Sequence, residues 1–205
     1  MKEYIILAAI IIITIFIIVE SIFIKKKNKA KLEELTNALS QKDYGKFYTL
    51  IEEKETSKYV AAFNIIYLKY TAAIMRNDPK KAFEEILSLE KYPKSRKQAI
   101  SIYTDAFYYF ASHSNNEAMK YCYEKLNKIR KFSSAEIELF YNVYCEKSYE
   151  YLEEILIAIE NSPETANKVP LVLLTAQMYK NMNDEKNASK FAKIASELLD
   201  KNNDN

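Results

Sequence analysis

The sequence predicts an all-α protein in which one membrane-spanning helix precedes an α-solenoid of about five helical hairpins. Three observations lead to this fold class. Residues 4–24 are almost continuously apolar, and the body repeats an amphipathic helical pattern every 33 to 37 residues. With 1 Gly and 4 Pro in 205 residues, the chain is poor in the residue that tight β-hairpin turns require.

The segment 4–24 reads YIILAAIIIITIFIIVESIFI, with Thr14, Glu20 and Ser21 as its only polar residues. As a helix it reaches about 30 Å, which is the thickness of the hydrocarbon core of a bilayer. A cleaved signal peptide would have a shorter apolar core and a cleavage site of small residues, and Val19-Glu20-Ser21 is not such a site. We therefore expect an uncleaved transmembrane anchor.

A basic juxtamembrane segment, residues 25–31 (KKKNKAK), follows the expected span and contains five lysines. Basic residues that flank a span stay in the cytoplasm. The expected topology is therefore single-pass in the cell membrane, with the N-terminus outside and the repeat domain cytoplasmic (N-out, C-in). Lys25, Lys26 and Lys27 are also candidates for contact with anionic lipid headgroups.

Residues 99–130 contain the clearest hairpin. Ile102, Ala106 and Tyr109 form one helical stripe, the polar residues SHSNN interrupt it, and a second stripe begins at Ala118. Apolar residues at this spacing share one face of a helix. The small side chains of Ala106 and Ala118 allow two helices to approach closely, so the segment predicts a helical hairpin.

The same register recurs along the body, residues 32–202. The residues equivalent to Ala118 are Phe47, Ala82, Tyr151 and Ala188. The residues expected to cap the second helices are Asp43, Asp78, Ser114, Lys147 and Asp184. Asp and Ser are good N-caps, whereas Lys is not. The first and fourth hairpins should be splayed or shifted in register, because large residues replace small ones at Leu35, Phe47, Leu139 and Tyr151. Residues 203–205 should form a disordered tail.

This pattern resembles the tetratricopeptide repeat (TPR), a 34-residue helical hairpin with small residues at two fixed positions. A related helical-hairpin array is the alternative. The resemblance implies a binding scaffold whose first helices line a concave surface. The surface positions of that family correspond here to Tyr67, Met75, Tyr103, Phe107, Phe110, Phe140 and Tyr144. Such an aromatic groove suits an amphipathic helix or an extended peptide. The alternative is that these rings fill the seams between repeats.

Composition argues against most enzymatic chemistry. A single Gly excludes glycine-rich phosphate-binding loops, and His113 is the only histidine. Cys122 and Cys145 lack the spacing of a metal site, so we expect buried thiols. Residues 1–31 contain six lysines and two glutamates, which leaves the body slightly acidic and a poor nucleic-acid binder. We expect no enzyme activity, cofactor, metal or nucleic-acid partner.

The expected function is a membrane-anchored TPR-like scaffold or adaptor that binds a protein or peptide partner through the aromatic concave groove, on the cytoplasmic side. One alternative is an extracytoplasmic membrane-tethered chaperone or protease-regulating subunit with the same fold, against which the lysines after the span argue. A third is an enzyme that uses two of the many carboxylates, although no motif points to one.

Overall fold

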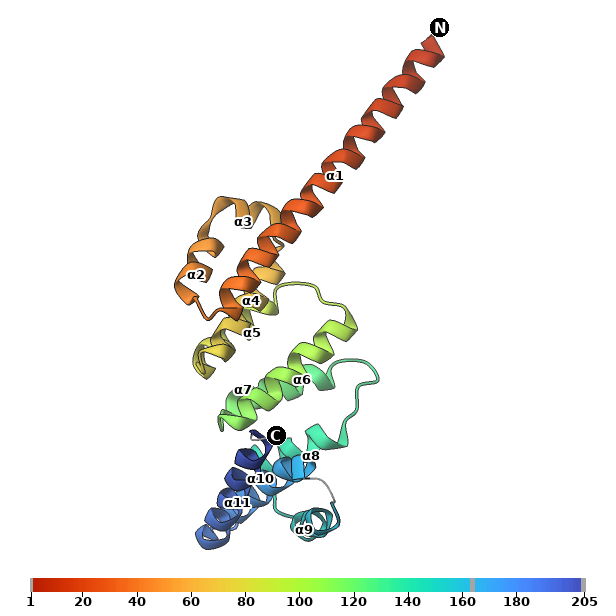
Figure 1. The fold of residues 1–205 in the computed structure, drawn as a ribbon. Coiled ribbons are helices and arrows are strands. Elements are labelled where there is room, and N and C mark those ends of the chain that lie inside the picture. Colours follow the sequence, from red (N-terminus) through yellow and green to blue (C-terminus); the bar gives the residue numbers. More distant parts are fainter. Residues whose placement is uncertain (1, 163–164, 204–205) are drawn as a thin grey trace. The chain divides into compact units, whose positions relative to one another are not determined.

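The computed structural model describes the backbone of residues 2–162 and 165–203, and the side chains of residues 19–162 and 168–200. Over the described backbone the chain forms eleven α-helices and no strand (Figure 1). The all-α fold class is therefore confirmed. The helices fall into two compact units, unit 1 (Met1–Pro93) and unit 2 (Lys94–Asn205), and each is described by itself.

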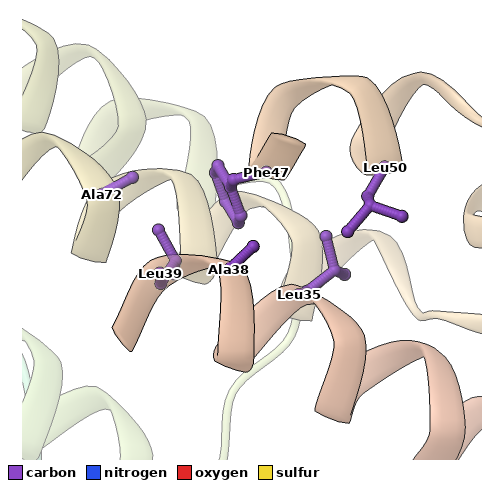
Figure 2. Packing of buried hydrophobic residues seen from close by; sticks show 6 residues of the cluster. All are labelled: Leu35, Ala38, Leu39, Phe47, Leu50 and Ala72. Carbon is purple, nitrogen blue, oxygen red and sulfur yellow. The ribbon is translucent and has the colours of Figure 1, made fainter. Parts of the chain in front are cut away.

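Unit 1 consists of α1 (Lys2–Ser40), α2 (Tyr44–Glu52), α3 (Lys54–Tyr59), α4 (Ala62–Met75) and α5 (Pro79–Leu89). Both α2 and α3 pack against α1, and α4 pairs with α5. The core joins Leu35, Ala38 and Leu39 of α1 to Phe47, Leu50 and Ala72 (Figure 2). Leu35 and Phe47 are 0% exposed, so the large residues that depart from the repeat pattern fill this first interface.

The first helix is longer than the sequence predicts. α1 continues without a break from Lys2 to Ser40. It passes residue 24, where the span is expected to end, and residue 31, where the basic segment is expected to end. The Asn28 side-chain amide donates to the carbonyl oxygen of Tyr59 (2.6 Å), and Lys31 Nζ donates to Glu53 (2.8 Å). The packed part of α1 therefore begins at Asn28, inside the basic segment.

The structure describes little of the expected membrane span. Among the residues whose side chains are described, no helix is long and apolar enough to cross a bilayer. Residues 4–18, the larger part of the expected span, lie outside that set. In the expected tail, Asn203 is the last residue of a helix, and residues 204 and 205 lie outside the described residues.

Unit 2 consists of α6 (Arg96–Ser112), α7 (Asn116–Asn127), α8 (Ala135–Tyr144), α9 (Leu152–Asn161), α10 (Thr165–Asn181) and α11 (Glu185–Asn203). α6 pairs with α7, and α10 pairs with α11. Ala106 and Ala118 are both 0% exposed, so the hairpin predicted over residues 99–130 is confirmed. Both α8 and α9 pack against α10.

Four hairpin turns share one backbone geometry. Each contains a residue with positive φ, which is 57° at Lys42, 54° at Asn77, 52° at Ser114 and 60° at Asn183. In each turn this residue donates its N–H to the carbonyl three residues earlier, and the next residue donates to the carbonyl five residues earlier. This is the Schellman motif that ends many helices. The residue after it caps the next helix, so each turn is very short.

The observed caps correct the predicted register at two places. Asp43, Asp78 and Asp184 accept hydrogen bonds from the first turns of α2, α5 and α11, as predicted. The prediction of Ser114 as a cap is wrong by one residue. Asn115 accepts the bond from the Ala118 N–H, because Ser114 holds the left-handed position.

The fourth turn differs from the others. α9 begins at Leu152, well after Lys147, and its N-cap residue Tyr151 makes no side-chain cap bond. The Asn181 side-chain amide of α10 holds this loop by donating to the carbonyl oxygens of Val143 (2.8 Å) and Ser148 (3.1 Å). A contact from a helix 33 or more residues away thus replaces the local cap.

Candidate functional site

Three helices of unit 2 surround an apolar pocket of about 330 Å³. They are α6, α8 and α10, which the predicted register places as the first helices of the third, fourth and fifth repeats. The lining residues are Tyr108, Ala111, Ser112, Glu136, Phe140, Tyr144, Pro170 and Leu173. We call this site the α6/α8/α10 pocket.

Aromatic rings form one wall of the pocket. Tyr108 meets Phe140 edge-on at 5.4 Å between ring centroids, and Phe140 stacks on Tyr144 at 6.1 Å. Such pairs hold rings in defined orientations. Phe140 is 8% exposed, whereas Leu173 of α10 is 40% exposed. The pocket therefore combines a rigid aromatic wall with an accessible aliphatic side chain.

One carboxylate gives the pocket its charge. Glu136 is exposed and accepts a hydrogen bond from the Tyr108 phenol. The pKa of Tyr108 is raised well above its ordinary value, mainly by burial of the phenol and to a smaller extent by this hydrogen bond. Burial also raises the pKa of Tyr144. Both phenols are therefore neutral at physiological pH, and Glu136 is the charged residue of the lining. This arrangement favours a ligand that has an apolar side chain beside a positive charge.

The seven sequence-predicted groove residues occupy different environments. Phe140 and Tyr144 lie together in the α6/α8/α10 pocket. Tyr103, Phe107 and Phe110 on α6 are 5%, 0% and 0% exposed. A partner can touch Phe107 or Phe110 only if the helices separate.

Tyr67 and Met75 lie on α4 of unit 1 and are 38% and 39% exposed. Tyr67 stacks on Phe63 at 6.4 Å between ring centroids. A binding role for the groove residues stays a prediction. In unit 2, Tyr103, Phe107 and Phe110 are buried, so the α6/α8/α10 pocket with Tyr144 is the place where a partner could reach the predicted residues.

The sequence-based search missed Glu136, Pro170 and Leu173. The signal was present, because Leu173 occupies in the fifth hairpin the position that Tyr103 occupies in the third, and Glu136 is the equivalent in the fourth. Apart from Met75, the search selected only aromatic residues at these positions, and so it passed over a leucine, a proline and a carboxylate. Applied without regard to residue type, the same positions would have found all three.

The remaining reactive groups have structural surroundings. His113 ends α6, with its Nδ1 2.8 Å from the Tyr109 carbonyl oxygen. Cys122 is buried as predicted, whereas Cys145 is only half-buried. Burial raises the pKa of the Cys122 thiol to about 12 and that of Cys145 to about 11, so both are protonated at neutral pH. Within the described part of the chain, no group of three or more His, Cys, Asp or Glu could hold a metal ion.

Comparisons of the chain with protein-family models, with curated proteins and with solved structures find no match.

Proposed function

We propose that this protein is a membrane-anchored, TPR-like scaffold that binds a polypeptide segment through the α6/α8/α10 pocket. The observation that carries this proposal is the convergence of accessible side chains from three successive first helices on one apolar pocket. The family resemblance assigns partner binding to the same helices. Buried apolar anchors of a partner commonly dominate the binding energy at such sites.

The pocket chemistry defines the partner segment. A volume of about 330 Å³ is at the small end of ligand-binding pockets, so it accepts one or two apolar side chains. A lysine or arginine next to this anchor would lie beside the Glu136 carboxylate and orient the segment. The proposed ligand is thus a helical or extended segment with a Leu or Phe anchor flanked by a basic residue.

A peptide-binding experiment tests the pocket. Full-length protein in detergent is titrated with peptides that carry a Phe or Leu anchor, with and without a neighbouring lysine. Leu173→Asp should weaken binding at least about tenfold, because it places a charge among apolar groups. The matched control is Leu199→Asp, since Leu199 on α11 is 48% exposed and lies outside the pocket lining.

A second variant tests the charge. Glu136→Gln should weaken binding of the lysine-containing peptides and leave the neutral peptides unchanged. Equal affinity of Leu173→Asp and Leu199→Asp for every peptide, or no binding by the unaltered protein, would contradict the proposal.

The second part of the proposal is that residues 4–24 span the membrane with the repeat domain in the cytoplasm. It rests on the apolar run and on the lysines that follow it. The variant Asn202→Cys, in a Cys145→Ser background, should resist a membrane-impermeant maleimide in intact cells and react after permeabilisation. Labelling in intact cells would reverse the topology and favour the extracytoplasmic alternative.

A further inference from the structure

The end of the proposed span meets solvent in the structure. Val19, Ile22, Phe23 and Ile24 of α1 are 59%, 61%, 51% and 44% exposed. These four apolar residues lie among the six that precede the basic segment, the other two being Glu20 and Ser21. Lys27 Nζ lies 5.9 Å from the centroid of the Phe23 ring. If the helix spans a bilayer, the lipid covers these residues and the lysines mark the headgroup layer.

Unit 1 folds back toward this end of α1. Phe47 of α2 belongs to the core cluster that contains Leu39. Further along the chain, Glu53 binds Lys31, and the Tyr59 carbonyl accepts the bond from Asn28. The contacts on α1 thus move from residue 39 to residue 28 as the chain passes from α2 through α3. In Figure 1, α3 accordingly lies at the end of unit 1 beside the projecting part of α1.

The depth of α3 follows from helix geometry. Asn28 is four residues after Ile24, which is about 6 Å along the helix axis. The headgroup layer on each side of the hydrocarbon core is about 5 to 7 Å thick. The C-terminal end of α3 is hydrogen-bonded to Asn28 through the Tyr59 carbonyl. This end therefore lies within the headgroup layer when Ile24 lies at the edge of the hydrocarbon core.

Acidic groups neutralise part of the basic charge of this region, and Lys29 Nζ lies 3.7 Å from a carboxylate oxygen of the exposed Glu33. Lys31 Nζ lies 2.9, 2.8 and 3.9 Å from carboxylate oxygens of Glu34, Glu53 and Glu55. These contacts place three acidic groups around a lysine on the side of α1 that faces the folded unit. Exposed basic residues on α1 and α3 are Lys25, Lys26, Lys29, Lys54 and Lys58. Glu20 is an exposed acidic residue on the apolar side of the basic segment.

We propose that α3 and the Lys25–Lys29 stretch of α1 form a headgroup collar that contacts anionic phospholipids. The collar rests on the proposed membrane anchor. Lys54 and Lys58 supply positive charge from a second helix, and Tyr59, whose ring lies 5.2 Å from Lys58 Nζ, has the amphipathic character of residues found at membrane interfaces. Because α1 has no break between Ile24 and Asn28, the collar fixes the orientation of unit 1 on the membrane.

The absence of Trp from the chain makes a single-tryptophan experiment possible. Full-length Tyr59→Trp is reconstituted in vesicles of phosphatidylcholine and phosphatidylglycerol that carry bromine on the acyl chains next to the headgroups. If the collar contacts the headgroups, the bromine atoms should strongly quench the fluorescence of the tryptophan at position 59. The control is Tyr44→Trp in the same unit, because Tyr44 packs on the cluster that contains Leu39, about 16 Å further along α1 than Asn28. Its fluorescence should be unchanged.

One further measurement separates failure of the anchor from failure of the collar. Flotation of the vesicles reports the anchor, and a chain that does not float overturns both the anchor and the collar. If the chain floats and Tyr59→Trp is quenched no more than Tyr44→Trp, the collar alone is wrong.

Adding Lys54→Glu and Lys58→Glu to Tyr59→Trp should reduce its quenching, as should vesicles of phosphatidylcholine alone. If neither the two charge reversals nor the removal of anionic lipid reduces the quenching, the preference for anionic lipid is wrong.

Discussion

Single residues determine how tightly the hairpins turn. Lys42 and Ser114 occupy left-handed positions that glycine adopts without a steric penalty and that Asn tolerates better than most residues. Each is followed directly by an Asp or Asn that caps the next helix. One residue thus ends a helix and the next begins another, and the strain at the first residue is offset by the hydrogen bonds of both.

Lys42→Gly should therefore stabilise the protein. Relief of the left-handed strain exceeds the entropy that glycine adds to the unfolded chain, for a net gain of about 0.5 kcal/mol. Asn77→Gly is the control and should have a smaller effect, because Asn already tolerates this conformation. Urea unfolding followed by circular dichroism measures both, and a loss of stability in Lys42→Gly would contradict the argument.

The buried Cys122 thiol predicts a pH dependence of stability. Its folded pKa, about 12, exceeds the ordinary value of 9.0, so above pH 9 the unfolded chain loses this proton first. Stability should then fall as pH rises through the window between these values, by up to about 1.4 kcal/mol per pH unit for this group. Cys122→Ala should show a shallower decline between pH 9 and 11; equal slopes would refute the assignment.

Pairs of helices are the units that bury the apolar stripes. α6 packs against α7, and Ala106 and Ala118 are both 0% exposed, so the small stripe residues of both helices are fully buried. α8 and α9 instead use α10 as their common support. The hydrogen bonds of Asn181 belong to this second arrangement, because they join the end of α10 to the loop after α8.

Ala118→Trp should strongly destabilise the α6/α7 hairpin. Overpacking of a filled interior typically costs about 1–3 kcal/mol, and tryptophan adds far more than a methylene. Lys120→Trp is the matched control, since Lys120 is exposed on the same helix. Thermal unfolding should distinguish the two variants, and equal melting temperatures would show that Ala118 does not face α6.

Asn181→Leu should loosen the segment between α8 and α9. It removes the donor to two carbonyl oxygens, at a cost of about 1–3 kcal/mol where these groups lose access to water. Hydrogen exchange should increase in residues 145–151. Asn127→Leu, at an exposed position of α7, should leave that exchange unchanged, and a similar response in both variants would exclude the proposed role of Asn181.

At the scale of the whole molecule, the chain divides between Pro93 and Lys94. The proposed membrane attachment and the lipid collar belong to unit 1, whereas the α6/α8/α10 pocket belongs to unit 2. The two proposed tasks therefore use separate sets of helices. This separation allows the pocket to be studied apart from the span.

Residues 94–205 expressed alone should fold and keep the pocket. Each compact unit buries its own apolar residues, so the fragment should show a helical spectrum and a cooperative thermal transition. It should bind the same peptides as the full chain. A helical but non-cooperative fragment that exposes apolar surface would show that unit 2 depends on unit 1.

The sequence alone determined the features that depend on neighbouring residues. The all-α class follows from helical periodicity and scarce glycine, and the caps at Asp43, Asp78 and Asp184 follow from a carboxylate placed before an amphipathic run. These patterns succeed because a helix start is decided by hydrogen bonds over three or four residues. The span, its orientation and the TPR likeness were inferred in the same way and stay predictions.

Tertiary structure decided which aromatic residues line the pocket. Phe107 and Phe140 occupy equivalent positions in their hairpins, yet Phe107 is fully buried and Phe140 lies in the pocket. Their difference, like the contribution of Leu173 and the late start of α9, arises from contacts with helices about 30 residues away. A local pattern specifies which face of a helix is apolar; which neighbour covers that face is settled only when the helices pack.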